Sequence, residues 1–248
     1  SWNWKANGGT RVTFTESGND PGGGYQANTT AGFSIVDYTG TGGAGTMAHG
    51  LGAVPKLIMV KNRTAATDWA VYHAANTAAP ETDYLVLNET TATADSDAWW
   101  NDTAPTSTVF SLGTHDRVND DSETLIAYLF AEKQGYSKFG GYTGNGNADG
   151  PFVYTGFKPA WLMVKKTNDA KGWHIHDNVR PGYNPSTNKV SADSTAAEAT
   201  SSEYILDLLS NGFKLRSSDN EQNGDGETWV YAAFAHQPFV TSGGVPCT

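Results

Sequence analysis

Residues 159–177 read PAWLMVKKTNDAKGWHIHD, and residues 55–73 read PKLIMVKNRTAATDWAVYH. Both stretches place a proline before an apolar run, continue with a lysine-containing polar turn, and begin a second short run at a tryptophan. The match extends in both directions at an offset of about 104 residues, close to the commonest size of one domain. The sequence therefore predicts two related domains in tandem, produced by an internal duplication.

Shorter matches at the same offset lie on both sides of these stretches. GFS at residues 32–34 corresponds to GYS at 135–137, and YTGTG at 38–42 corresponds to YTGNG at 142–146. The predicted parts are the end of a preceding repeat plus a Gly/Thr-rich linker at 1–31, repeat 1 at 32–134, repeat 2 at 135–240 and a flexible tail at 241–248.

The pattern within each copy indicates strands rather than helices. Short runs of β-branched and aromatic residues alternate with Gly, Asn, Asp, Thr and Pro, which is typical of all-β sandwiches. We expect two tandem antiparallel β-sandwich domains of jelly-roll or lectin-like type. LIMV at 57–60 and WLMV at 161–164 are apolar on both faces, so both should be central strands. The tryptophans in strand patterns are predicted to lie in the core, namely Trp69, Trp161, Trp173 and Trp229.

Charge and composition disfavour several partners. The net charge of −10 and pI of about 4.9 are unlike those of proteins that bind duplex DNA or anionic membranes through basic clusters. No apolar run approaches the roughly 20 residues of a membrane-spanning helix. The single cysteine, Cys247, cannot form an intrachain disulfide. We therefore expect neither nucleic acid binding nor membrane insertion.

Several blocks in fixed order carry a family resemblance, among them GFSIVDYTGTG, HGLGAVPKLIMVKNR, GYSKFGGYTGNGNADGPFVYTGFKPAWLMVKK and SNGFKLR. The chain resembles, over residues 32–239, a tandem-repeat β domain of unassigned activity found in structural and tail-fibre-like proteins of tailed phages, often marine ones. This resemblance implies an extracellular location at the virion surface, other virion chains as partners and a role in host adhesion. It brings no catalytic residues with it.

No catalytic residue is predicted from the sequence itself. A nucleophile elbow of the G-x-S-x-G type is missing from the sequence. Glu123 and Glu227 occupy equivalent places before the last strand of each copy, but a catalytic pair cannot be identified from scattered carboxylates. We interpret both as solvent-facing residues at the start of a strand, because glutamate usually stays exposed.

The sequence offers residues for two kinds of metal site. His174 and His176 flank Ile175, so in a strand they share one face and could chelate a transition metal if a third ligand were near. Surface or partly buried histidines are the alternative interpretation. Acidic, Gly-rich turns could instead hold calcium, the one cofactor that the sequence indicates, although tight turns favour the same residues. The candidate calcium ligands are Asp116, Asp120, Asp121, Asp219 and Asp225.

The best local pattern for sugar recognition is a loop of the first copy. Trp99 and Trp100 precede Asn101 and Asp102. Aromatic faces beside hydrogen-bonding side chains suit a pyranose, whose apolar C–H face is ringed by hydroxyls. Since neighbours on an extended segment face opposite ways, we expect one of the two tryptophans at most to be in the core.

The function that these observations favour is display on a virion fibre with binding of host-surface polysaccharide and no catalysis. Weak sites repeated along a fibre would give tight attachment through avidity. Two alternatives remain open: a depolymerase that cleaves surface polysaccharide, and an inert spacer or assembly module. A homo-oligomer such as a trimer is compatible with a fibre, although no heptad pattern demands one.

Overall fold

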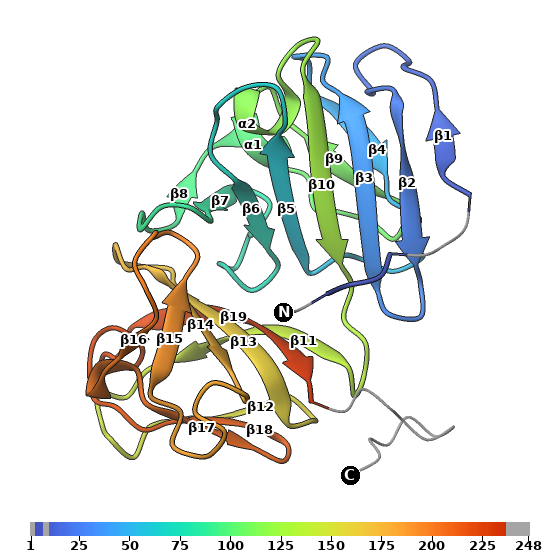
Figure 1. Ribbon diagram of the computed structural model, residues 1–248. Helices are drawn as coiled ribbons and strands as arrows, with labels where there is room; N and C mark the ends of the chain where they lie inside the picture. The colour runs from blue at the N-terminus through green and yellow to red at the C-terminus, as the bar shows by residue number, and fades with distance from the viewer. Residues whose placement is uncertain (1–2, 7–9, 237–248) are drawn as a thin grey trace. The chain divides into compact units, whose positions relative to one another are not determined.

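The computed structural model describes residues 3–6 and 10–236, and it is an all-β protein built from several antiparallel sheets (Figure 1). The chain divides into two compact units. The first contains Ser1–Leu87 and Thr93–Glu132, and the second contains Asn88–Ala92 and Lys133–Thr248. The division after Glu132 lies beside the boundary that the sequence predicted between residues 134 and 135. No helix among the described residues has the length and apolarity needed to cross a membrane.

The first unit contains an eight-stranded sheet and a two-stranded sheet. The large sheet has the order β1-β2-β3-β10-β5-β6-β7-β8, and the small one pairs β4 with β9. The strands are β1 (Val12–Phe14), β2 (Gly23–Asn28), β3 (Phe33–Thr39), β4 (Gly45–Ala48), β5 (Leu57–Asn62), β6 (Ala70–His73), β7 (Asp83–Val86), β8 (Ala94–Asp95), β9 (Val109–Leu112) and β10 (Thr124–Phe130). Two short helices, α1 (Asp97–Trp100) and α2 (Asp116–Asn119), lie before and after β9 in the chain.

The second unit contains a six-stranded sheet and a three-stranded sheet. Their orders are β11-β19-β13-β14-β15-β16 and β12-β18-β17. The strands are β11 (Ser137–Thr143), β12 (Phe152–Tyr154), β13 (Pro159–Lys166), β14 (Trp173–Asp177), β15 (Asn188–Ser191), β16 (Ala199–Thr200), β17 (Leu206–Leu209), β18 (Gly212–Leu215) and β19 (Thr228–Ala235). A short 3₁₀ helix, Ser202–Tyr204, precedes β17.

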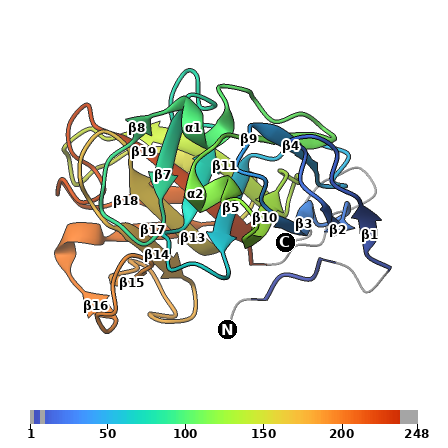
Figure 2. The same cartoon turned by 90° about the horizontal axis from the view of Figure 1, so that it is seen from above.

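In each unit a core forms on one face of the larger sheet. Both views place β4 and β9 over one face of β3 and β10 (Figures 1 and 2), and the buried core contains side chains of both sheets. The core of the first unit includes Val36, Val60, Phe110, Leu125 and Ala127. The core of the second unit includes Leu162, Val164, Phe213, Tyr231 and Ala233. Every second residue of a strand points inward, which is why these alternating positions are the buried ones.

The expected central strands are confirmed. β5 pairs with both β6 and β10, and β13 pairs with both β14 and β19. Trp173 and Trp229 are buried as predicted, whereas Trp69 and Trp161 are only partly buried. Trp69 stacks on Tyr128 with ring centroids 6.2 Å apart.

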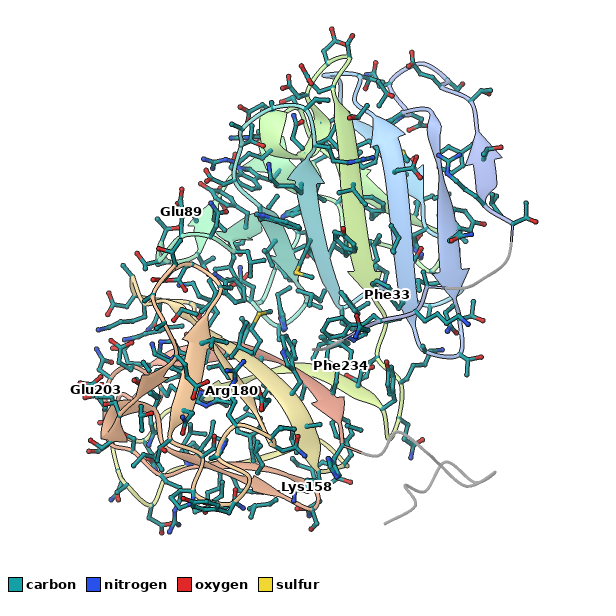
Figure 3. All side chains as sticks on the ribbon, viewed as in Figure 1. Phe33, Glu89, Lys158, Arg180, Glu203 and Phe234 are labelled. Carbon is teal, nitrogen blue, oxygen red and sulfur yellow. The ribbon has the colours of Figure 1, made fainter. Side chains whose placement is uncertain are left out.

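Aromatic packing also marks the opposite face of the large sheet. Phe33, the first residue of β3, is labelled in Figure 3. It stacks on Phe130, the last residue of β10, with ring centroids 4.7 Å apart. Trp4 contacts the same Phe130 ring edge-on at 5.9 Å.

The first 31 residues contain one strand more than predicted. A linker with one edge strand near Val12–Thr15 was expected after the end of a preceding repeat; that edge strand is present as β1, and a second strand, β2, pairs with it and joins it to β3. Residues 3–6, expected in the strand that ends that preceding repeat, have no strand conformation. The expected tail at residues 241–248 lies outside the described part of the chain. The sheet has room for β2 because β3 is otherwise an edge, and exposed edges tend to be paired.

A buried asparagine fixes the loops at one end of the first unit. The side chain of Asn119 is fully buried at the end of α2. Its Oδ1 accepts from Thr41 N at 2.9 Å, and its Nδ2 donates to Gly43 O at 2.5 Å and Gly113 O at 3.2 Å. Backbone groups of three separate loop positions are therefore satisfied by one amide.

The second unit contains the same arrangement about 104 residues later. Asn223 is fully buried, and its Oδ1 accepts from Asn145 N at 2.9 Å. Its Nδ2 donates to Asn147 O and Ser217 O, both at 2.8 Å. An adjacent bond repeats as well, since Tyr38 Oη donates to Val118 O at 2.6 Å and Tyr142 Oη donates to Gln222 O at 3.0 Å.

Replacing either buried asparagine should destabilise its own unit. Asn223→Ala leaves the buried carbonyl of Ser217, and the more exposed carbonyl of Asn147 and N–H of Asn145, without their partner, so we expect a loss of about 1–3 kcal/mol in the free energy of unfolding. Asn119→Ala should cost a similar amount. The measurement is urea unfolding, with the exposed Asn211→Ala as a control that should change stability by less than about 0.5 kcal/mol. A wild-type midpoint for Asn223→Ala would contradict this role.

Candidate functional site

The predicted sugar-binding loop is not available to a ligand as expected. Trp99 and Trp100 lie in α1 and are only 1% and 2% exposed. Trp99 stacks on Tyr84 at 3.7 Å, and Trp100 packs edge-on against Tyr72 at 5.9 Å. The prediction that one tryptophan at most would be in the core was wrong, because a helical turn, unlike an extended segment, can direct two neighbours into the same core.

The two polar residues of that loop stay exposed. Asn101 and Asp102 both have positive φ, 52° and 44°, and they end the helix in a left-handed turn. This conformation is one that asparagine and aspartate tolerate well. Without an exposed aromatic face beside them, Asn101 and Asp102 form turn structure and not a sugar platform.

The predicted calcium ligands are spread along the turns of both units. Asp116 begins α2, while Asp121 and Asp225 are exposed turn residues. Asp219 Oδ1 accepts from Glu221 N at 2.9 Å, and Asp120 Oδ2 accepts from Asn62 Nδ2 at 3.4 Å. Among the residues that the structure describes, no three His, Cys, Asp or Glu side chains are grouped as a metal would require. Calcium binding stays a prediction.

One acidic turn already holds a cation from the chain itself. Lys166 is fully buried, and its Nζ lies 3.2 Å from Asp169 Oδ2, 3.2 Å from Glu227 Oε2 and 2.7 Å from Asn220 Oδ1. Glu227 therefore acts in an ion pair and is partly buried, unlike the solvent-facing residue that was expected. The first unit has Asn62 at the corresponding place in β5.

The two histidines of β14 point to one face, as predicted, but they lie in the interior. His174 and His176 are 1% and 0% exposed, so the interpretation as surface or partly buried histidines was wrong. His174 Nδ1 and His176 Nε2 lie 3.2 Å and 2.6 Å from the amide nitrogen of Gln222. The side-chain amide thus occupies the point on which the two imidazoles converge.

Charged groups surround this histidine pair on its outer side. His174 Nε2 lies 3.3 Å from Glu221 Oε2, and Lys171 Nζ lies 2.7 Å from Glu221 Oε1. Hydrogen bonding by His174, and then by Lys171, lowers the pKa of Glu221 to about 2. Burial, reinforced by the neighbouring His174, lowers the pKa of His176 to about 3 against a weaker opposing effect of the Asn188 backbone. The pair is therefore neutral at pH 7.

This polar cluster belongs to the second unit alone. Ala70 and Tyr72 occupy the equivalent positions of β6, and Val118 stands where the second unit has Gln222. Because the cluster is enclosed within the protein, it can act on stability but offers no open contact to a large ligand.

The surface that sequence reasoning missed lies on the edge strand β12. Phe152 and Tyr154 are 44% and 65% exposed, whereas Val153 between them is buried in the core. Strand alternation therefore places both rings on the outer face of the three-stranded sheet. We call these two residues the aromatic platform. Alternation in FVY was the available signal, but three residues are too few to distinguish a strand from a loop.

Hydrogen-bonding groups lie next to the platform. Lys214 faces Phe152 across the β12–β18 pair, and its Nζ contacts Asp149 Oδ1 and Gly150 O, both at 2.8 Å. Gly212 faces Tyr154, and a Cβ added there would lie 3.0 Å from the Phe152 ring. The glycine thus leaves space for the Phe152 ring to lie across the sheet.

The first unit has no aromatic side chains at the matching positions of β4. In the first unit Met47 pairs with Phe110, and in the second Val153 pairs with Phe213. This register aligns Thr46 and Ala48 with the two platform residues. Thr46 instead makes hydrogen bonds to Asp20 Oδ1, at 2.6 Å from its backbone N and 3.0 Å from its hydroxyl.

Acid should destabilise the second unit before the first. The folded pKa of His176, about 3, lies below its unfolded value of about 6.5, so the unfolded state binds more protons in that window. The contribution of neutral His176 to the free energy of unfolding is thus fully present above pH 6.5. It is lost as the pH falls towards 3, by at most about 1.4 kcal/mol per pH unit. Hydrogen exchange of β14 amides, corrected for intrinsic rates, measures this, with β6 amides as the internal reference.

The matched variant is His176→Tyr, which installs the residue of the first unit. It should remove most of the slope between pH 6.5 and 4.5, whatever its effect on stability at pH 7. A slope equal to that of the wild type would show that His176 is not the titrating group.

The comparisons with known proteins give a family but no described relative. No curated protein and no solved structure matches the chain. A family model described as a domain of unknown function, DUF7483, matches residues 1–238 and so spans both units. The chain belongs to this family, DUF7483.

Proposed function

We propose that the chain is a non-catalytic glycan-binding protein and that the aromatic platform of the second unit is its sugar contact. The observation that carries the proposal is the pair of exposed rings, Phe152 and Tyr154, on one face of an edge strand. Residues two apart on a strand are about 6.6 Å apart, so two rings can contact neighbouring sugars of one chain. Stacking of apolar C–H faces on such rings is favourable in water.

The polar neighbours of the platform support the same ligand class. Asp149 and Lys214 offer an acceptor and donors for sugar hydroxyls, and their Nζ–Oδ1 contact of 2.8 Å places the two groups side by side. Arg216 Nε lies 3.3 Å from Asp207 Oδ2 and adds a second charged pair at the C-terminal end of β18. Aromatic faces with a few convergent polar groups are the common composition of small-ligand sites.

The proposal includes the origin and setting of the two units. We infer that both derive by duplication from one two-sheet domain, which is supported by the matching bonds of Asn119 and Asn223. The resemblance to phage tail-fibre-like repeats supports a place on a virion surface, beside other virion chains and in contact with host polysaccharide. In such a fibre, repeated weak sites act through avidity.

Removing the platform should weaken binding without unfolding the protein. The double variant Phe152→Ala, Tyr154→Ala loses two stacking contacts of about 0.5–1.5 kcal/mol each, which corresponds to roughly a 5- to 150-fold weaker affinity. The measurement is a glycan array followed by calorimetry on the glycans bound. Thr46→Ala, at the matching place in the first unit, is the control and should bind as the wild type does.

Three outcomes would contradict the proposal. Unchanged binding by the double variant would place the site elsewhere. Release of sugar from bound glycans would indicate a depolymerase. Binding of no glycan, even from host polysaccharide, would favour a spacer or assembly module. The array run with calcium and with chelator also tests the predicted calcium sites.

A further inference from the structure

A polar groove crosses one end of the eight-stranded sheet in the first unit. It has a volume of about 510 Å³, which falls within the range of sites for small ligands. Strands β1, β2, β3 and β10 and the residue after β5 line it. Its charged and hydroxyl side chains are Arg11, Thr13, Glu16, Asp37, Thr39, Arg63 and Thr124.

Glycines of β2 create the hollow. A Cβ on Gly23 would lie 2.2 Å from Asp37 O, and a Cβ on Gly24 would lie 2.6 Å from the guanidinium carbon of Arg11. Arg11 therefore crosses β2 above Gly24 and reaches Asp37, with Nε–Oδ1 at 2.8 Å and Nη2–Oδ2 at 2.5 Å. This bidentate pair fixes one wall of the groove and leaves no net charge there.

The other wall is a row of side chains on neighbouring strands. Thr39 pairs with Thr124 across β3 and β10, and Arg63 N donates to Thr124 O at 2.8 Å. The three side chains thus lie in one line across the sheet at the strand spacing of about 4.8 Å. Along this line the hydroxyls of Thr39 and Thr124 come first, and the guanidinium of Arg63 comes next.

Arg63 is the unused charge of the groove. Its side chain is exposed, and within residues 3–6 and 10–236 its guanidinium has no hydrogen-bond or ion-pair partner. Glu16, the remaining carboxylate, lies beside Gly22 at the opposite end of the row. An anion at the Arg63 end is therefore separated from Glu16 by the width of several strands.

The chemistry of the lining selects a class of ligand. Strands β2, β3 and β10 are each paired on both sides, so a peptide could be added as a strand only at the outer edge of β1, at the opposite side of the groove from Arg63. Recognition must come from hydroxyls, one free guanidinium and the Arg11–Asp37 pair. The lining offers a single guanidinium outside the Arg11–Asp37 pair, which matches one carboxylate and not the several adjacent charges of a polyphosphate.

We propose that this groove binds an acidic saccharide, with the carboxylate of a uronic acid residue on Arg63 and sugar hydroxyls on Thr39 and Thr124. Arginine matches a carboxylate with two parallel hydrogen bonds, which fixes the orientation of the sugar. The site stands on its own residues and does not depend on the aromatic platform. It would give the first unit a binding role distinct from that of the second.

Calorimetry with tri-galacturonate, and with its fully methyl-esterified form, tests the proposal on the whole chain. We expect binding of the acid form, at least ten-fold weaker binding of the ester, and an affinity that falls with added salt. Arg63→Gln should weaken binding of the acid form at least ten-fold, because it removes the charged fork. Arg63→Lys should retain part of the affinity as a point charge.

Lys5→Gln is the matched control, since it changes the net charge equally at an exposed lysine outside the groove. Equal losses in both variants, or equal affinity for acid and ester, would overturn the proposal. Competition by oligo-glutamate as strong as that by tri-galacturonate would show a carboxylate site that is not specific for sugar. The aromatic platform is tested separately with neutral glycans. Arg63→Gln should still bind them, whereas the Phe152→Ala, Tyr154→Ala variant should not.

Discussion

Both units depend on how the backbone of their connecting loops is satisfied at one end of the sheets. A β-sandwich pairs the backbone of its strands, but the loops between strands leave N–H and C=O groups that need partners. Asn119 in one unit and Asn223 in the other place a single amide between two loop segments and bond to three backbone positions of them. With the loops held in this way, the short strands beside them can keep their register over only four or five residues.

The two units share these loop bonds but differ in the side chains that fill their interiors. The first unit fills the space beside β6 with rings, and Tyr72 packs against Trp100 there. The second unit fills the equivalent space with His174, His176 and Gln222, which bond to one another. Buried polar groups are stable only when they are paired, so replacing one member of such a cluster leaves the others without partners. An aromatic core and an imidazole–amide core are thus two solutions on the same strand pattern.

The sequence was sufficient for the strands and insufficient for the surfaces. The apolar runs LIMV at 57–60 and WLMV at 161–164 predicted central strands, and they lie in β5 and β13, because a strand buried on both faces has apolar residues at every position. β1 and β2 were not predicted as a pair, since their glycines weaken any strand pattern and become informative only when Arg11 is seen crossing above Gly24. Only one of Trp99 and Trp100 was expected in the core, because an extended chain was assumed where a helical turn exists. No local pattern could reveal that Arg63 lacks a partner within the described part of the chain, because that depends on residues from several strands.

The positions that the two units share and those that they do not therefore have different meanings. Shared residues, such as Tyr38 and Tyr142 with their matching bonds to loop carbonyls, serve the fold, and the same fold hosts many functions. Exposed differences are free of that constraint: rings at Phe152 and Tyr154 replace a threonine and an alanine, and two strands of the groove around Arg63, β1 and β2, precede the region that matches the second unit. Each unit then carries its own surface chemistry on one frame. A ligand that presents both an apolar sugar face and an acidic sugar could engage both, which turns two weak contacts into one stronger attachment if its length can span the sites.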